Sequence, residues 1–268
     1  MWLQMAGVKS IPLDTDANMN PIIEKAEALI TDRTRAIVLV SPNNPSGAIY
    51  SNQLLQKFFD LCKSNQIRLI IDETYKDFHP NASKPHTLLE NNDWDQVLTI
   101  LYSFSKTYRM TGHRIGALLT SKENLIEIEK ALDTFTVCPP QLGQYAANWG
   151  LNNLEAWAAE RRTEILQRAK HFSEKFQPLS AAGWSLRGCG AYFAFVEHPF
   201  EDESNILAPL ILRDQGILLM PGTMFYPKHN PLGSRSFRIA FANIDKNKIS
   251  TLLERLKDLS YQRLNSKN

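Results

Sequence analysis

Residues 96–106 read QVLTILYSFSK, a short apolar run that ends in two serines and a lysine. Such a run, bounded by polar residues, is typical of a strand buried in a sheet. Two similar runs come earlier: Ala36–Val40 precedes the loop Ser41–Gly47, and Arg68–Ile71 precedes Asp72. We therefore expect three buried strands, each ending at a polar segment.

Helical patterns separate these strands. Pro21–Ile30 has apolar residues at helical spacing, and Ser51 is a suitable N-cap for a helix that places Phe58 on its apolar face. Val8–Leu13 and Ala117–Thr120 are candidates for further short strands. Strands that alternate with helices indicate a parallel sheet covered on both faces, where ligands bind beyond the carboxyl ends of the strands.

The second part of the chain has a different organisation. Leu154–Phe176 has the pattern of one long helix that connects two domains, which we place at residues 1–155 and 156–268. In the second domain we expect strands at Ala191–Glu197 and Ser236–Ala242 and helices at Ile206–Gln215 and Lys246–Arg263.

The composition excludes several classes of protein. The 268 residues carry 30 Lys and Arg against 28 Asp and Glu, a formal net charge of +2, so a broad basic face for nucleic acid is not expected. No apolar run approaches the roughly 18 residues of a membrane helix, and the N-terminus lacks a signal-peptide pattern. Three widely spaced cysteines and six histidines without ligand spacing predict no disulfide framework and no metal site, which favours a cytoplasmic protein.

The segment Ser103–Gly116 (SFSKTYRMTGHRIG) carries the strongest chemical signal. Lys106 follows a buried strand and has arginines nearby, and like charge and desolvation both favour the neutral form of a lysine. A neutral amine is a nucleophile that forms Schiff bases with carbonyl compounds. Ser103, Ser105 and Arg114 are suitable donors to a phosphate. The alternative is an ordinary solvated loop, and composition alone favours neither.

Two further polar segments follow the other strands. Asp72 can stabilise a protonated ring nitrogen, and Tyr75 can offer its phenol to the same ligand. Taken alone, Asp72 is more simply a cap for the turn that follows it. The segment 43–47 (NNPSG), taken alone, is simply a turn.

Together, these segments resemble the class I and II aminotransferases, which are pyridoxal-phosphate enzymes of the aspartate aminotransferase fold. Residues 44–47 (NPSG) are similar to the family's Asn-Pro-Thr-Gly element, and residues 72–75 (DETY) to its Asp-x-x-Tyr element. Residues 103–106 (SFSK), followed by Arg114, resemble the family's lysine signature. Residues 236–239 (SFRI) resemble its C-terminal arginine segment, so the resemblance covers essentially the whole chain.

The resemblance implies the α/β fold of type I pyridoxal-phosphate transferases. This fold has a three-layer α/β/α large domain around a mainly parallel sheet, followed by a smaller α+β C-terminal domain. The resemblance also implies pyridoxal 5′-phosphate as the cofactor, an amino acid and a 2-oxo acid as substrates, and a homodimer.

The resemblance assigns roles to particular residues. Lys106 is expected to bind the cofactor as a Schiff base and to move a proton of the substrate. Asp72 is expected to pair with the ring nitrogen, while Tyr75 and Asn44 bond the phenolic oxygen. The remaining expectations are Ser103, Ser105 and Arg114 as phosphate ligands, with Arg238 and Asn44 beside the substrate.

The chain also departs from the family pattern. Relatives carry, before the point where this sequence begins, an N-terminal segment that contributes phosphate ligands and an aromatic ring stacked on the cofactor. We expect that segment to be missing here, and therefore expect weak cofactor binding and poor activity.

Other interpretations stay open. A carbon–sulfur β-lyase on the same scaffold would release pyruvate and ammonia without a 2-oxo acid co-substrate. An inactive module without cofactor is the third possibility. We expect Arg161 and Arg162 to form a solvated helix face, and residues 220–222 (MPG) to form a turn.

Overall fold

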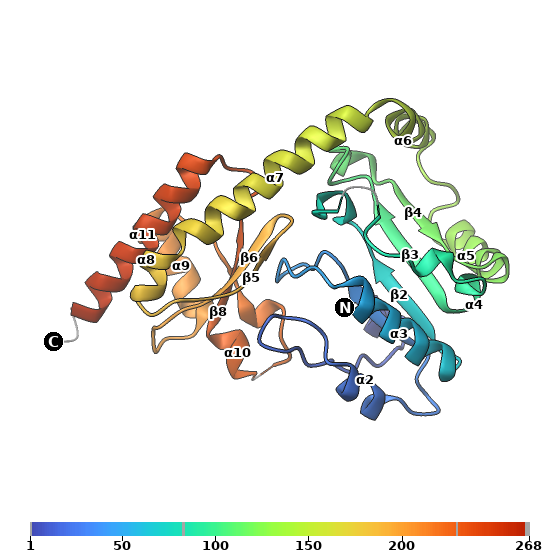
Figure 1. Ribbon diagram of the computed structural model, residues 1–268, viewed down its shortest axis with the longest axis horizontal. Helices are drawn as coiled ribbons and strands as arrows, with labels where there is room; N and C mark the ends of the chain where they lie inside the picture. Colours follow the sequence, from blue (N-terminus) through green and yellow to red (C-terminus); the bar gives the residue numbers. More distant parts are fainter. Residues whose placement is uncertain (1, 82–83, 229, 266–268) are drawn as a thin grey trace.

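The computed structural model describes residues 2–81, 84–228 and 230–265, and its first half is built on a four-stranded sheet. Strands β1 (Ala36–Val40), β2 (Arg68–Asp72) and β3 (Leu98–Ser103) run parallel in that order. Strand β4 (Gly116–Leu119) pairs antiparallel with β3. All three parallel strands thus end at the same edge, which lies towards the centre of the molecule (Figure 1).

Helices flank this sheet. Helix α3 (Asn52–Ser64) begins at Ser51, whose side chain accepts the Leu54 N–H as predicted, and it buries Phe58 and Phe59 against the strands. Val38 of β1 is 53% exposed, so part of the sheet's second face is open. The other helices of this half are α1 (Trp2–Met5), α2 (Ile23–Leu29), α4 (Trp94–Val97), α5 (Lys122–Phe135) and α6 (Gln141–Asn153), with 3₁₀ turns at Lys76–Phe78, Leu88–Glu90 and Thr111–His113.

Helix α7 (Glu155–Lys175) is the predicted long helix, and it runs along one side of the molecule from the first sheet to the second (Figure 1). The second sheet is antiparallel, with the order β5 (Ser185–Gly190), β6 (Phe193–Glu197), β8 (Ser236–Ala240) and β7 (Met220–Pro221). Its remaining elements are α8 (Gln177–Ala181), α9 (Ser204–Gln215), α10 (Pro231–Ser234), α11 (Lys246–Asn265) and a 3₁₀ turn at Gly222–Met224.

A hydrophobic core joins this second sheet to its helices. Phe172 of α7, Phe237 of β8 and Leu256 of α11 are fully buried in it. Within the described ranges, no helix combines the length and the apolar character needed to cross a lipid bilayer.

The structure corrects two predictions about elements and contains one strand that was not predicted. Residues Val8–Leu13 form no strand, because their backbone makes no ladder with a neighbour in the described chain. Met220–Pro221, expected to be part of a turn, forms the short strand β7. Strand β5 was not predicted, because its sequence SLRGCG contains two glycines and an arginine in place of an apolar run.

The two sheets meet at a close contact between backbones. A Cβ atom on Gly188 would lie 2.4 Å from the Ser46 carbonyl oxygen, and one on Gly190 would lie 2.3 Å from the Gly47 carbonyl oxygen. The glycines of β5 therefore allow the loop after β1 to pack directly on the second sheet. This contact holds the carboxyl edge of the first sheet against β5, β6 and β8.

Candidate active site

The predicted lysine lies where β3 ends. Strand β3 stops at Ser103, and the Ser103 Oγ accepts the Ser105 N–H at 3.3 Å, which turns the chain towards Lys106. The Lys106 Nζ lies 5.6 Å from the centre of the Tyr75 ring. The structure therefore brings the first and second polar segments together, as the shared edge of the parallel strands predicts.

Asp72 and Tyr75 follow β2. The Asp72 Oδ1 accepts the Thr74 N–H at 2.9 Å, so this carboxylate does stabilise the next turn, as the simpler interpretation expected. Tyr75 is 4% exposed, and its ring makes edge contacts with Tyr192 and Phe193, each at 5.3 Å between ring centres. Burial raises the pKa of Tyr75 to about 12, and the positive charge of Arg238 acts in the opposite direction.

Asn44 and Arg238 meet across the two sheets. The Arg238 Nη1 donates to the Asn44 Oδ1 at 2.8 Å, although the two residues are 194 positions apart in the chain. The guanidinium lies close to two rings, 4.7 Å from the centre of Phe193 and 5.0 Å from that of Phe225. Burial lowers the pKa of Arg238. Among the described residues, its buried Nε has no hydrogen-bond partner.

Arg114 is the predicted site residue with the fewest contacts to the others. The pairing of Ser103 with Gly116 brings its backbone close to the end of β3. Its side chain is exposed, and its Nη1 donates to the Thr111 carbonyl at 2.9 Å. Arg114 has φ of 53°, in the left-handed region that a non-glycine residue adopts only at a cost.

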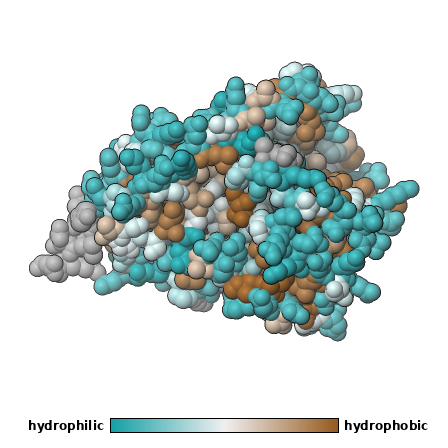
Figure 2. All heavy atoms as spheres, in the orientation of Figure 1, coloured by the Kyte–Doolittle hydropathy of each residue, from teal (hydrophilic) through white to brown (hydrophobic). Residues whose placement is uncertain are grey.

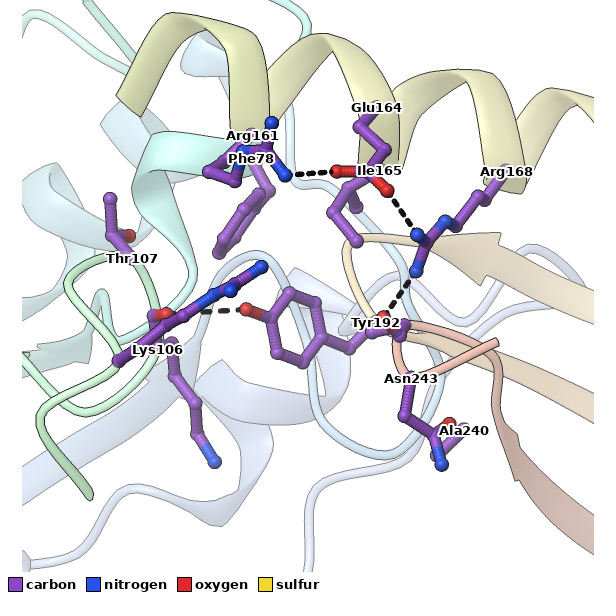
Figure 3. A pocket seen from close by; sticks show the side chains of 12 residues that line it. Phe78, Lys106, Thr107, Arg161, Glu164, Ile165, Arg168, Tyr192, Ala240 and Asn243 are labelled. Carbon is purple, nitrogen blue, oxygen red and sulfur yellow. Dashed lines mark hydrogen bonds and ion pairs between the residues drawn. The ribbon is translucent and has the colours of Figure 1, made fainter. Parts of the chain in front are cut away.

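Sequence patterns did not point to the residues that hold the Lys106 loop. Asp77 accepts hydrogen bonds from the Tyr102 hydroxyl and from the Thr107 hydroxyl, the latter at 2.7 Å. From the second sheet, the Tyr192 hydroxyl donates to the Lys106 carbonyl at 3.3 Å, as Figure 3 shows. Tyr192 follows two glycines in the segment 188–192 (GCGAY). These glycines were the sequence feature that could have drawn attention to Tyr192, because they indicate an unusual backbone there.

This set of groups matches the polar positions of pyridoxal phosphate. The cofactor has an aldehyde, a ring nitrogen, a phenolic oxygen and a phosphate, and the site offers an amine, a carboxylate, a phenol with an amide, and two hydroxyls with a guanidinium. The unpartnered Nε of Arg238 adds a donor for a carboxylate. The kinds of group among the described residues therefore fit this cofactor.

Comparisons with known proteins identify the family of the chain. The model of the family described as "Aminotransferase class I and II" matches residues 2–256. The chain is 26% identical over 245 residues to an aspartate aminotransferase of Thermotoga maritima, an alignment that covers 90% of this chain and 60% of the relative. It is 28% identical over 241 residues to a (5-formylfuran-3-yl)methyl phosphate transaminase of Methanocaldococcus jannaschii, covering 88% of this chain and 60% of the relative.

Solved structures give the same result for the fold. An aromatic aminotransferase from Pyrococcus horikoshii superposes with a TM-score of 0.84 at 24% identity, covering 97% of this chain and 69% of that one. An aminotransferase from Mycobacterium tuberculosis superposes with a TM-score of 0.80 at 26% identity, covering 95% of this chain and 64% of that one. The chain thus spans about 60% of the length of the curated relatives it matches.

Proposed function

Because the chain belongs to the class I and II aminotransferase family, we propose that it moves an amino group from an L-amino acid to a 2-oxo acid with pyridoxal phosphate as its cofactor. The observation that carries this proposal is the bond between Arg238 and Asn44 at 2.8 Å. This hydrogen bond joins a guanidinium of the second sheet to the loop after β1. Arg238 also acts electrostatically on Tyr75, whose ring lies beside the Lys106 amine.

The proposed cofactor ligands follow from the chemistry of the donor set. Bound pyridoxal phosphate supplies an aldehyde that bonds to amines and a ring that withdraws electrons from the attached carbon. In this proposal, Lys106 Nζ would hold the cofactor at its aldehyde carbon and the Asp72 carboxylate would pair with the ring nitrogen. Tyr75 donates to the phenolic oxygen together with the Asn44 Nδ2, because Asn44 Oδ1 is already engaged by Arg238.

The proposed phosphate ligands are the two hydroxyls after β3 and one guanidinium. Ser103 and Ser105 lie on the same turn. Arg114 is exposed, with one nitrogen donating to Thr111, and the rest of its guanidinium remains available to a phosphate. Arg–phosphate bonds are charge-assisted and strong.

Substrate binding and proton transfer fall to two side chains. Arg238 binds the substrate α-carboxylate through its Nε edge, since Nη1 is taken by Asn44. With substrate and cofactor bound, the Lys106 Nζ would be the amine that takes up the proton from the substrate's Cα.

We further propose that the protein acts as a homodimer. Helices α5 and α6 and the segment between them expose large apolar side chains, among them Phe135 at 83% and Leu142 at 82%. Exposed apolar patches of this kind mark protein–protein contacts.

An isotope-transfer assay tests the function. The 268-residue chain is incubated with pyridoxal phosphate, a panel of L-amino acids labelled at the amino nitrogen, and a 2-oxo acid, and mass spectrometry follows the label. We expect labelled nitrogen in the amino acid derived from the 2-oxo acid, and none with Lys106→Ala. Labelled ammonia released without a 2-oxo acid would instead indicate the β-lyase, and transfer that survives Lys106→Ala would contradict the proposal.

A further inference from the structure

A cavity of about 390 Å³ lies between α7, the Lys106 loop and the end of β8, and its lining is strongly basic. Arg109 comes from the loop, Arg161 and Arg168 come from α7, and Lys106 also contributes to the wall. Glu164 is the one carboxylate among the residues that line it. Figure 3 shows Arg161, Glu164 and Arg168 along α7, facing Tyr192.

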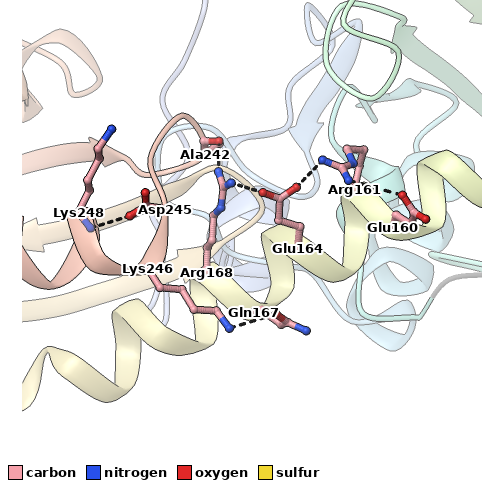
Figure 4. A network of polar contacts seen from close by, with 9 residues as sticks. All are labelled: Glu160, Arg161, Glu164, Gln167, Arg168, Ala242, Asp245, Lys246 and Lys248. Carbon is pink, nitrogen blue, oxygen red and sulfur yellow. Dashed lines mark hydrogen bonds and ion pairs between the residues drawn. The ribbon is translucent and has the colours of Figure 1, made fainter.

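The α7 side chains are fixed by one another. Glu164 accepts Arg161 Nη1 at 2.6 Å and also accepts Arg168, which in turn donates to the Ala242 carbonyl (Figure 4). Both Glu164 oxygens are therefore engaged, and the Arg161 Nη2 also lies 3.6 Å from the Glu160 Oε2. The Nε of Arg161 is buried and has no hydrogen-bond partner in the part of the chain that the structure describes. This corrects the expectation that Arg161 lies on a solvated face.

Arg109 reaches the cavity from a strained backbone. Its φ is 55°, in the left-handed region where a residue other than glycine is uncommon and where strain marks functional positions. Its guanidinium lies 5.8 Å from the Trp157 ring centre. No hydrogen bond or ion pair from a described residue engages that guanidinium, so its donors are available.

This basic cavity is distinct from the proposed cofactor site. Figure 3 shows the Lys106 side chain pointing away from the arginines of α7, on the other side of the Tyr192 ring. The Lys106 amine instead lies by Tyr75. The charges of Arg109 and Arg168 both act on the Tyr192 hydroxyl, so these guanidinium groups and the hydroxyl share one region.

We propose that the cavity binds the phosphate or carboxylate group of a small anion, held by Arg109 and Arg161. Three arginines line the cavity together with one carboxylate, Glu164, whose oxygens are both already paired, and guanidinium groups bind both kinds of oxyanion. The volume is within the range of small-molecule sites. A bound anion would join the Lys106 loop to α7 and so restrain the loop that carries the lysine.

Calorimetric titration at constant ionic strength tests the site, with inorganic phosphate and succinate as separate probes. We expect at least one probe to bind, and Arg161→Gln to weaken its affinity at least tenfold. Arg109→Gly is the second variant, because glycine suits the left-handed backbone and keeps the fold while removing the guanidinium. Arg162→Gln, next to Arg161 on α7 but outside the cavity lining, is the matched control and should bind as the parent does.

A further variant separates this site from the proposed cofactor site. Phosphate that bound at the cofactor site would be weakened by Arg114→Gln and left unchanged by Arg109→Gly and Arg161→Gln. That pattern would overturn the proposal, and so would failure of both probes to bind. Affinity that falls in the Arg109 and Arg161 variants but stays unchanged in Arg114→Gln supports it, whichever probe binds.

Discussion

Arg238 has one edge of its guanidinium engaged and the other free. Its Nη1 donates to Asn44, and its guanidinium lies 4.7 Å from the Phe193 ring centre and 5.0 Å from the Phe225 ring centre. These contacts fix the plane of the group. The buried Nε, unpartnered among the described residues, leaves an edge with the two-point geometry that a carboxylate requires.

Arg238→Lys should weaken amino acid binding and leave covalent cofactor attachment intact. A lysine keeps the charge but loses the planar fork. One charge-assisted hydrogen bond is worth about 1.5–3 kcal/mol, so we expect KM to rise about tenfold to a hundredfold. Steady-state kinetics measure this, with Arg235→Lys as the exposed control on the same segment. An unchanged KM in Arg238→Lys would remove this residue from the substrate site.

The positions of some site residues follow from the sequence, whereas their contacts with distant residues do not. The positions of Lys106 and Asp72 follow from strands that end in polar residues, and the structure brings the Lys106 amine beside Tyr75. The family resemblance placed Asn44 and Arg238 beside the substrate, but the bond between them was not predicted, because no local pattern relates residues 194 positions apart. The placement of Arg161 was wrong, since helical periodicity does not show which turn of α7 faces another loop.

At the scale of elements, the packing of β5 on the loop after β1 depends on glycine. Gly190→Ala would set a Cβ 2.3 Å from the Gly47 carbonyl oxygen, which belongs to backbone and cannot rotate away. We expect the free energy of unfolding to fall by about 1–3 kcal/mol, as in other overpacked sites. Urea denaturation measures the change. Gly112→Ala, which has no atom within 4 Å of the added Cβ, should change it by less than about 0.5 kcal/mol.

The histidine after β6 should make the second sheet sensitive to acid. His198 is 2% exposed, its Nε2 donates to the Ser234 carbonyl at 3.1 Å, and its buried Nδ1 has no partner among the described residues. Burial lowers the pKa of His198 to about 4, from an ordinary value of 6.5. The unfolded chain therefore binds the proton more tightly, so stability is complete above about pH 6.5 and falls as the pH drops towards 4.

Urea denaturation at two pH values tests whether the free energy of unfolding falls as the pH is lowered. Between about pH 7.5 and pH 5, we expect the parent to lose about 2 kcal/mol of unfolding free energy through this group. His198→Gln should lose less over the same interval, because glutamine does not titrate. The same loss in both proteins would show that other groups cause it.

Part of the order of elements was predictable, for physical reasons that are local, whereas helices α5 and α6 were not predicted. Apolar runs bounded by polar residues marked β1, β2 and β3, and the cap at Ser51 marked the start of α3. Strand β5 was not predicted because it is only partly buried and is rich in glycine. It is stabilised by pairing with β6. The strand with which a segment pairs cannot be read from the residues of that segment alone.

At the scale of the whole molecule, apolar side chains gather on the surface around α5 and α6. Phe135, Val137, Leu142, Tyr145 and Trp149 are each more than half exposed. Figure 2 shows hydrophobic surface in brown towards the end of the molecule that carries these helices. The proposed division into domains at residue 155 stays a prediction, as does the homodimer.

Leu142→Glu should shift the protein towards smaller assemblies. A charge in an apolar interface costs desolvation energy on both subunits. Size-exclusion chromatography with light scattering measures the mass, and we expect a dimer for the parent and a monomer for the variant. Leu218→Glu is the control, because Leu218 is 74% exposed but lies in the other half of the chain. A parent that is monomeric at high concentration would contradict the proposed homodimer.

The central claim is that Lys106 carries pyridoxal phosphate, and reduction with borohydride followed by peptide mass mapping tests it most directly. The chain is incubated with the cofactor, reduced and digested, in parallel with Lys106→Ala and Lys76→Ala. Lys76 is the matched control, a lysine near the site whose amine lies 5.2 Å from the Tyr102 ring centre. We predict that the reduced adduct appears on the peptide containing Lys106, persists in Lys76→Ala and disappears in Lys106→Ala. An adduct on Lys76, or one that survives Lys106→Ala in the same yield, would contradict the account.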